Sequence, residues 1–346
     1  MLSLSIEGEA KTEALLPELS TIYNLKITAA EPRDGYYAVL AQDGVFQLHW
    51  EDDVEKTLSM LQCWDYLQNR GFPGLATLQM TSLGDLGFYL DNKLAYMTTP
   101  LSGRRGELGL KADAVRIAKT LAMLHLLSQD MPASIQNSLA QLKPIWPRFT
   151  KQLEELDLFR NMAFHRLYPT AFDLFFLKTY DEVARLAHGS IDLLAKMDID
   201  HLGNEVELMG LLQGSCHGRA FRVTDDGNLK LPDLKGSTRG LLAKDVGAFL
   251  DNICDFAQGS LAIARSAFGA YEVIRPLQHV EQELVYSLGI FPAGMWEIAN
   301  DYYKGQRKMG DPEAVEALRL EWARAVHRKE YWQRLLGDEL GYEDSN

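Results

Sequence analysis

Cysteine is scarce in this sequence. Cys63, Cys216 and Cys254 are the three cysteines in 346 residues, and they do not lie at the spacing of metal ligands. An odd and sparse count is typical of thiols that serve as small core side chains in a reducing compartment. The sequence therefore argues against a disulfide-stapled secreted protein and against a cysteine-based metal site.

Long apolar runs and an excess of basic residues are also absent. No apolar run approaches the ~18 residues of a membrane span. The first 19 residues have no basic start and become acidic within ten residues, unlike a secretory signal. The net charge of −13 argues against a nucleic-acid partner, because phosphate binding needs clustered Lys and Arg. We expect a soluble protein, cytoplasmic when synthesised, without a membrane or nucleic-acid partner.

The chain has enough apolar residues, 47%, to form two lobes with large cores. The first 98 residues combine helical and strand patterns, and we interpret them as a sheet with one inserted helix. Asp52 or Asp53 caps that helix, and Gly71 ends it. Helical patterns are expected at 5–22 and 53–69, and strands at 24–29, 36–41, 45–50, 76–80, 87–90 and 94–98.

The remainder is mainly helical. We predict an α+β fold with a small N-lobe at 1–98, a helical C-lobe at 99–336 and a frayed tail at 337–346. Two or three helices are expected between residues 147 and 200. Helices are predicted in particular at 112–127, 172–197, 244–268, 279–287, 292–304 and 312–336.

A hairpin at 217–236 interrupts the helical region. Asp226-Gly227 is a tight-turn signal between two short strands. Apolar residues alternate on both sides of it, at Phe221, Val223, Leu229 and Leu231. His217 precedes the first strand and Asp233 follows the second.

This hairpin resembles the catalytic hairpin of kinase-like phosphotransferases. There, an Asp orients the acceptor hydroxyl, an Asn holds magnesium, and a second Asp binds the metal. The resemblance places Arg219 at the first position, Thr224 at the second and Asp233 at the third. The interval from Arg219 to Asp233 is also roughly four residues shorter than in such enzymes.

Other segments resemble one branch of that superfamily, the spore coat CotS-type proteins, which are relatives of aminoglycoside and choline phosphotransferases. They are GYYAVLAQDGVFQLHW at 35–50, LAYMTTPLSGRR at 94–105, IAKTLAMLHLLS at 117–128, AFDLFFLKTY at 171–180 and the long stretch at 271–305. The resemblance covers residues 25–336 approximately. It implies the two-lobe fold of protein kinases and aminoglycoside phosphotransferases.

The resemblance also implies roles for further positions. His49 stands where the nucleotide-anchoring Lys is expected, with Glu55 as that residue's partner. Histidine is shorter and mostly neutral at pH 7, so it is a poor clamp for phosphates. His217 and Asp245 stand at structural positions of the catalytic loop. The same residues have plainer interpretations: His49 as a partly buried strand residue and His217 as a loop hydrogen-bonding residue.

The charges at the expected cleft leave two interpretations open. Arg219 and Lys235 are able to contact an anion, or Arg219 forms an ion pair with Asp233. Asp233 is the one candidate for holding a metal or a nucleotide's magnesium, and a single carboxylate does not make such a site.

These observations favour a catalytically inactive kinase-like protein that serves as a structural or interaction component of the bacterial endospore coat. Other coat proteins are the expected partners, and no cofactor is expected. One alternative is an ATP-dependent small-molecule phosphotransferase, acting on a hydroxyl, with a rearranged site that uses ATP and Mg²⁺. Another is a pseudokinase that binds a nucleotide or metabolite without turnover.

Overall fold

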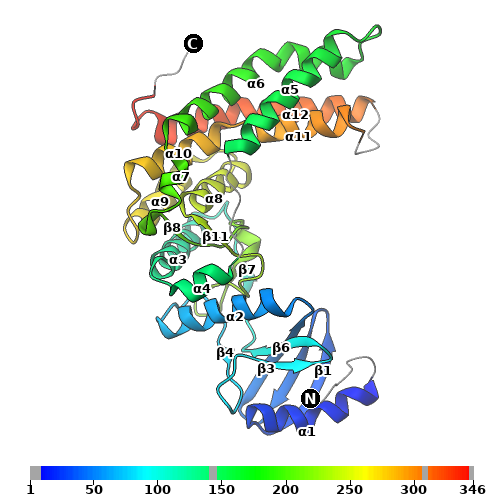
Figure 1. The fold of residues 1–346 in the computed structure, drawn as a ribbon, viewed down its shortest axis with the longest axis vertical. Coiled ribbons are helices and arrows are strands. Elements are labelled where there is room, and N and C mark those ends of the chain that lie inside the picture. The colour runs from blue at the N-terminus through cyan, green and yellow to red at the C-terminus, as the bar shows by residue number, and fades with distance from the viewer. Residues whose placement is uncertain (1–8, 140–145, 306–310, 343–346) are drawn as a thin grey trace. The chain divides into compact units, whose positions relative to one another are not determined.

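The computed structural model describes residues 9–139, 146–305 and 311–342 (Figure 1). The chain forms two compact units. The first contains Met1–Glu107, Arg116–Gln141 and Gly210–Arg239, and the second contains Leu108–Val115, Leu142–Met209 and Gly240–Asn346. The hairpin thus belongs to the same unit as the N-terminal sheet. The lobe boundary at residue 98 stays a prediction.

The first unit is built on an antiparallel sheet in the order β1-β2-β3-β6-β4, with β5 paired to β6. Gly35 (φ 81°) lies in the turn between the first two strands, and Gly44 (φ 145°) begins the third strand directly after the second turn. The predicted helix between the third and fourth strands is confirmed. The strands are β1 (Ile27–Arg33), β2 (Tyr36–Ala41), β3 (Gly44–Glu51), β4 (Leu78–Gln79), β5 (Phe88–Leu90) and β6 (Lys93–Thr98).

Two helices accompany this sheet. Helix α1 (Glu9–Tyr23) lies beside the sheet (Figure 1). Its Leu15 and Leu19 pack in one apolar core with the strand residues Val39 and Leu48. Helix α2 (Val54–Asn69) begins at Asp53, whose carboxylate accepts a hydrogen bond from the Lys56 N–H at 3.1 Å. Asp53 rather than Asp52 is therefore the N-cap, in the position where a carboxylate satisfies a free backbone N–H.

The predicted hairpin is confirmed. Strands β9 (Arg222–Val223) and β10 (Leu229–Lys230) pair antiparallel, and Gly227 takes φ 79° in the turn between them. All four predicted apolar residues are buried. The other elements of the first unit, some of which the two units share, are β7 (Arg104–Arg105), α3 (Lys111–Gln129), α4 (Ala133–Ser138), β8 (Met209–Leu212), a 3₁₀ turn at Gly218–Ala220 and β11 (Thr238–Leu241).

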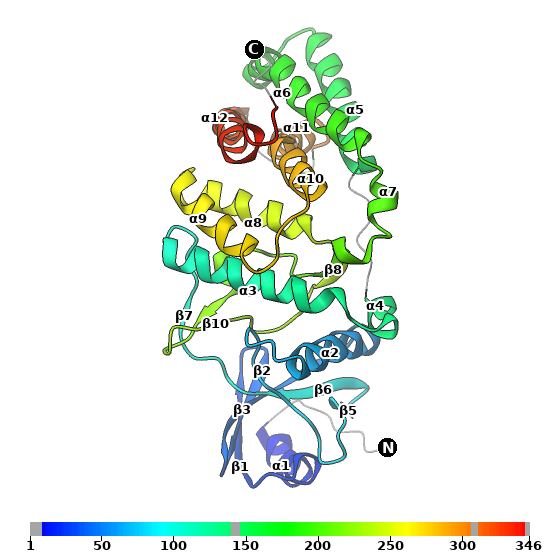
Figure 2. The same cartoon turned by 90° about the vertical axis from the view of Figure 1, so that its left-hand side faces the viewer.

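The second unit is helical, with α5 and α6 lying beside α11 and α12 (Figure 1) and α8 beside α9 (Figure 2). Amphipathic periodicity predicts most of these helices because each buries one apolar stripe. They are α5 (Trp146–Phe164), α6 (Ala171–Lys196), α7 (Ile199–Leu202), a 3₁₀ turn (Val206–Leu208), α8 (Ala243–Phe256), α9 (Leu261–Glu272), α10 (His279–Ile290), α11 (Ala293–Tyr303), α12 (Asp311–Trp332) and a π-helical turn (Gln333–Gly337).

The single helix predicted at 244–268 is wrong, because the chain breaks between α8 and α9. Gln258 and Gly259 adopt φ angles of 51° and 70°, which end a right-handed helix. Gly259 also lies against the His327 ring: a Cβ at this position would meet its Nε2 at 1.8 Å.

The expectation of a frayed tail is also wrong for residues 337–342. The Tyr342 hydroxyl donates to Glu283 at 2.8 Å, and its ring stacks on Tyr286 with centroids 5.1 Å apart. These contacts hold the chain end against α10. The last four predicted tail residues lie outside the described residues.

Candidate functional site

His49 is tied into the sheet by its neighbours on β6. Its Nε2 lies 3.2 Å from the Thr98 hydroxyl, and its ring stacks on Tyr96 with centroids 5.1 Å apart. Burial, with a further contribution from the nearby Lys235 ammonium, lowers the pKa of His49 to about 4. The imidazole is therefore neutral at pH 7 and offers no positive charge to a phosphate.

The lysine that approaches this strand comes from the loop after the hairpin. Lys235 Nζ lies 2.5 Å from Glu51 Oε1, at the end of β3. Glu55, the predicted acidic partner, is exposed in the first turn of α2, and its carboxylate forms no ion pair within the described residues. Glu51, which the sequence analysis did not single out, thus takes the place expected for Glu55.

Asp233 is half-buried and hydrogen-bonded locally. Its Oδ1 accepts the Lys235 N–H at 2.8 Å. Burial raises the pKa of this carboxyl, and the adjacent Glu51 adds to the rise, while the Lys235 N–H and ammonium oppose it.

The two positions at which the resemblance places magnesium ligands are engaged in local hydrogen bonds. Mg²⁺ requires several oxygen ligands in octahedral geometry. The Thr224 hydroxyl, at the predicted second ligand position, donates instead to the Asn228 carbonyl at 2.9 Å inside the hairpin turn. Within the described part of the chain, no group of three or more His, Cys, Asp or Glu side chains is arranged to hold a metal ion.

The loop before the hairpin carries an uncommitted positive charge. Arg219 is exposed in the 3₁₀ turn, and within the described residues its guanidinium forms no hydrogen bond or ion pair. The Arg219–Asp233 ion pair, one of the two interpretations left open, is therefore not formed. The neighbouring His217 caps the turn, its Nδ1 accepting the Ala220 N–H at 3.1 Å, although the imidazole itself is exposed.

Asp245 lies in the other compact unit. It is 2% exposed in the first turn of α8. A buried carboxylate at a helix start is consistent with a structural residue. Its predicted role as a cap of the catalytic loop stays a prediction.

A cavity of about 210 Å³ lies between α2 and the loop that follows Asp233. Lys56 and Met60 line it from α2, and Lys235 and Ser237 line it from the loop. The Ser237 Oγ is buried without a hydrogen-bond partner among the described residues. Cys63 also lines this cavity, but burial raises the pKa of its thiol to about 12, so it is not a reactive thiolate.

Sequence reasoning missed Tyr96, which lies in the segment at 94–105, and Glu51, which lies between the predicted strand at 45–50 and the predicted helix at 53–69. Tyr96 is 1% exposed, and its hydroxyl has no hydrogen-bond partner within the described residues. It faces His49 across the β3–β6 pair. Alternation along β6 predicts which face Tyr96 occupies, but the opposing residue depends on strand register.

Comparisons with known proteins agree with this architecture. No family model matches the chain. It is 23% identical over 248 residues to the endospore coat-associated protein YutH of Bacillus subtilis (strain 168), covering 69% of this chain and 67% of YutH. An aminoglycoside phosphotransferase from Alicyclobacillus acidocaldarius superposes with a TM-score of 0.78 at 19% identity, over 94% of this chain and 96% of that one.

A spectinomycin phosphotransferase in complex with ADP and spectinomycin matches with a TM-score of 0.58 at 14% identity, over 92% of this chain and 98% of that one. The chain therefore has the α+β, two-lobe fold of the kinase-like aminoglycoside phosphotransferases. Its likeness to YutH bears out the resemblance to the CotS-type spore coat branch. No helix in the described residues is both long and apolar enough to cross a membrane.

Proposed function

We propose that this protein is a catalytically inactive kinase-like component of the bacterial endospore coat. The observation that carries the proposal is the neutral His49, hydrogen-bonded to Thr98, at the strand position where the family resemblance places a nucleotide-anchoring lysine. An uncharged imidazole there supplies no cation for the phosphates, and Lys235, which approaches from the loop after the hairpin, is paired with Glu51. The coat location is inferred from the likeness to YutH, a coat-associated protein.

The remaining site positions support inactivity by their charge. Arg219 carries a positive charge where a carboxylate has to orient the acceptor hydroxyl, and Thr224 is used by the turn. Phosphoryl transfer depends on positioning and electrostatic stabilisation, and one such loss typically costs ~10²–10⁴ in rate. Loss of the base, the metal ligand and the phosphate anchor together leaves no physiological rate.

The proposal also requires a surface through which the chain interacts. Large apolar side chains are exposed where α5 ends and α6 begins, each between 41% and 83% exposed. Contiguous exposed apolar residues mark interaction sites on proteins. We call this the α5–α6 tip; its residues are Leu158, Met162, Phe164, Leu167, Tyr168 and Leu174.

Inactivity is tested by ATP turnover. We expect the purified protein with ATP, Mg²⁺ and a panel of hydroxyl acceptors to release no more ADP than Asp233→Ala, the matched variant. Turnover above buffer background that disappears in Asp233→Ala would contradict inactivity and favour the phosphotransferase with a rearranged site.

A tagged copy in a spore-forming bacterium tests location: we expect it in the extracted coat fraction, and recovery only from the core would contradict the coat assignment.

Ligand binding without turnover is a second candidate, and the cavity beside α2 favours it. A buried hydroxyl without a partner, such as that of Ser237, costs free energy that a bound ligand would recover. A ligand that binds only the folded state raises the unfolding midpoint. A midpoint that rises with ATP alone, without turnover, would favour this candidate, whereas a rise requiring both ATP and Mg²⁺ would favour the enzyme.

A further inference from the structure

A second cavity lies wholly within the helical unit. It has a volume of about 170 Å³ and receives side chains from α5, α8, α10 and α12. Arg148 and Lys244 line it, as do Asp251 and Arg328. None of these residues belongs to the degenerate phosphotransfer site.

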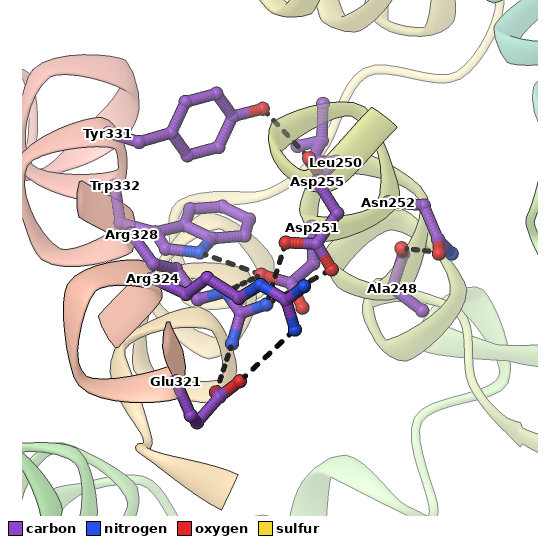
Figure 3. Close-up of polar contacts among 10 residues, drawn as sticks. All are labelled: Ala248, Leu250, Asp251, Asn252, Asp255, Glu321, Arg324, Arg328, Tyr331 and Trp332. Atoms are coloured by element: carbon purple, nitrogen blue, oxygen red, sulfur yellow. Dashed lines mark hydrogen bonds and ion pairs between the residues drawn. The ribbon is translucent and has the colours of Figure 1, made fainter. Parts of the chain in front are cut away.

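One of the cations that line this cavity, Arg328, is already paired with carboxylates. Arg328 Nε lies 2.9 Å from Asp251 Oδ1, and Arg328 Nη2 lies 2.9 Å from Asp255 Oδ1 (Figure 3). The third guanidinium nitrogen, Nη1, lies 3.9 Å from Glu321 Oε1. Three carboxylates thus surround one guanidinium. Arg328 is committed to joining α12 to α8 and leaves no charge for a ligand.

Two further cations line the cavity, Lys244 from α8 and Arg148 from α5. Within the described residues, neither Lys244 nor Arg148 forms an ion pair or hydrogen bond through its side chain. Burial lowers the pKa of the Lys244 ammonium, and the positive charge of Arg148 lowers it further, while Asp245 partly opposes this. The two like charges repel each other, and the carboxylate that also lines the cavity, Asp251, is engaged by Arg328, so a bound anion would reduce this repulsion.

The apolar part of the cavity limits what fits. Phe149 and Phe291 stack with ring centroids 3.7 Å apart, and Leu288 completes this side. Gly247 and Gly289 contribute no side-chain volume. Typical pockets for drug-sized ligands measure about 300–1,000 Å³, so this cavity suits a much smaller molecule.

We propose that Lys244 and Arg148 form a binding site for a small dianion, a phosphate monoester or a dicarboxylate whose short carbon chain lies against Phe149 and Phe291. The two cations bind the oxyanion from different helices. The site therefore links the start of α8 to the start of α5. This inference does not depend on the coat assignment or on inactivity in the other unit.

The test is isothermal titration of the full chain with inorganic phosphate and, separately, with malonate, at constant ionic strength. We expect saturable one-to-one binding of at least one of them. Lys244→Met should weaken it by about tenfold or more, because a charge-assisted hydrogen bond is lost. Arg148→Gln, which alters an exposed side chain and therefore leaves the fold intact, should weaken it similarly.

A matched variant controls the assignment. Lys178→Met removes an exposed lysine of α6 and should leave binding unchanged. No saturable heat with either anion would overturn the proposal, as would binding that survives both Lys244→Met and Arg148→Gln. If Lys244→Met does not fold, as judged by circular dichroism, Arg148→Gln decides.

Discussion

At the scale of single residues, His49 shows how neighbouring side chains determine what a residue does. It stands where the family resemblance places an anchoring lysine, and its ring interacts inward, with Tyr96 and Thr98. Sequence alone predicted that His49 is a poor phosphate clamp, because histidine is short and mostly neutral. It did not predict that Lys235 approaches the same strand, because the Lys235–Glu51 pair depends on tertiary folding.

The titration of His49 gives a prediction about stability. Its pKa falls from an ordinary 6.5 to about 4 in the folded protein, so between these values the unfolded state binds the additional proton. Stability rises with pH wherever the unfolded state binds more protons, so the wild type loses stability as pH falls from about 6.5 to about 4. The full loss is on the order of 3 kcal/mol.

Replacement of His49 by Gln keeps a hydrogen-bonding group near Thr98 and removes the titration. We expect the pH dependence of its unfolding free energy, measured by urea denaturation at pH 7 and pH 4.5, to be smaller than that of the wild type. His188→Gln, at an exposed position of α6, should retain the wild-type dependence. If the unfolding free energy of His49→Gln depends on pH as strongly as that of the wild type, His49 binds its proton equally well in the folded and unfolded states.

At the scale of elements, local signals predicted the ends of some helices and missed others. Asp53 caps α2 as expected, because a carboxylate before an apolar-periodic run is a strong start signal. The break between α8 and α9 was missed, although Gly259 lies there, because apolar periodicity continues on both sides. Contact with the His327 ring excludes a larger residue at this position, and that contact is visible only in the folded protein.

The close contact between α10 and the end of α12 gives a prediction about a glycine. A Cβ on Gly289 would lie 2.1 Å from Cε2 of Trp332, whose side chain is fully buried. Gly289→Ala should therefore destabilise the protein by about 1–3 kcal/mol, because overpacking outweighs the helix propensity gained. Gly189→Ala, in α6 with open space around it, should instead stabilise by about 0.5–1 kcal/mol. Urea unfolding of both variants tests this, and a Gly289→Ala protein as stable as the wild type would show that Trp332 moves freely.

At the scale of the whole molecule, the sequence predicted the fold class but not which apolar side chains would be exposed. Pattern analysis assigns apolar residues of helices to the core, and at the α5–α6 tip that assignment fails. Phe164, Leu167 and Tyr168 are 70%, 83% and 82% exposed. They follow one another around the turn between two helices, where no further element covers them in the described residues.

If the α5–α6 tip is the surface by which the chain is held in the coat, its apolar area is what binding buries, at roughly 25 cal/mol per Å². The triple replacement of Phe164, Leu167 and Tyr168 by Ser should therefore lower the coat-bound fraction several-fold in extracted spores, measured by quantitative immunoblot. Its unfolding free energy should change little, because exposed residues contribute little to folding. Replacement by Ser of Leu83, Tyr89 and Val273, which are 88%, 65% and 83% exposed but scattered along the chain, removes comparable apolar side chains without touching the tip. Equal coat recovery of both triple variants would show that the tip does not bind the coat. A single exposed residue buries too little area to hold a partner, so the comparison tests whether three neighbouring apolar residues bind better than three scattered ones.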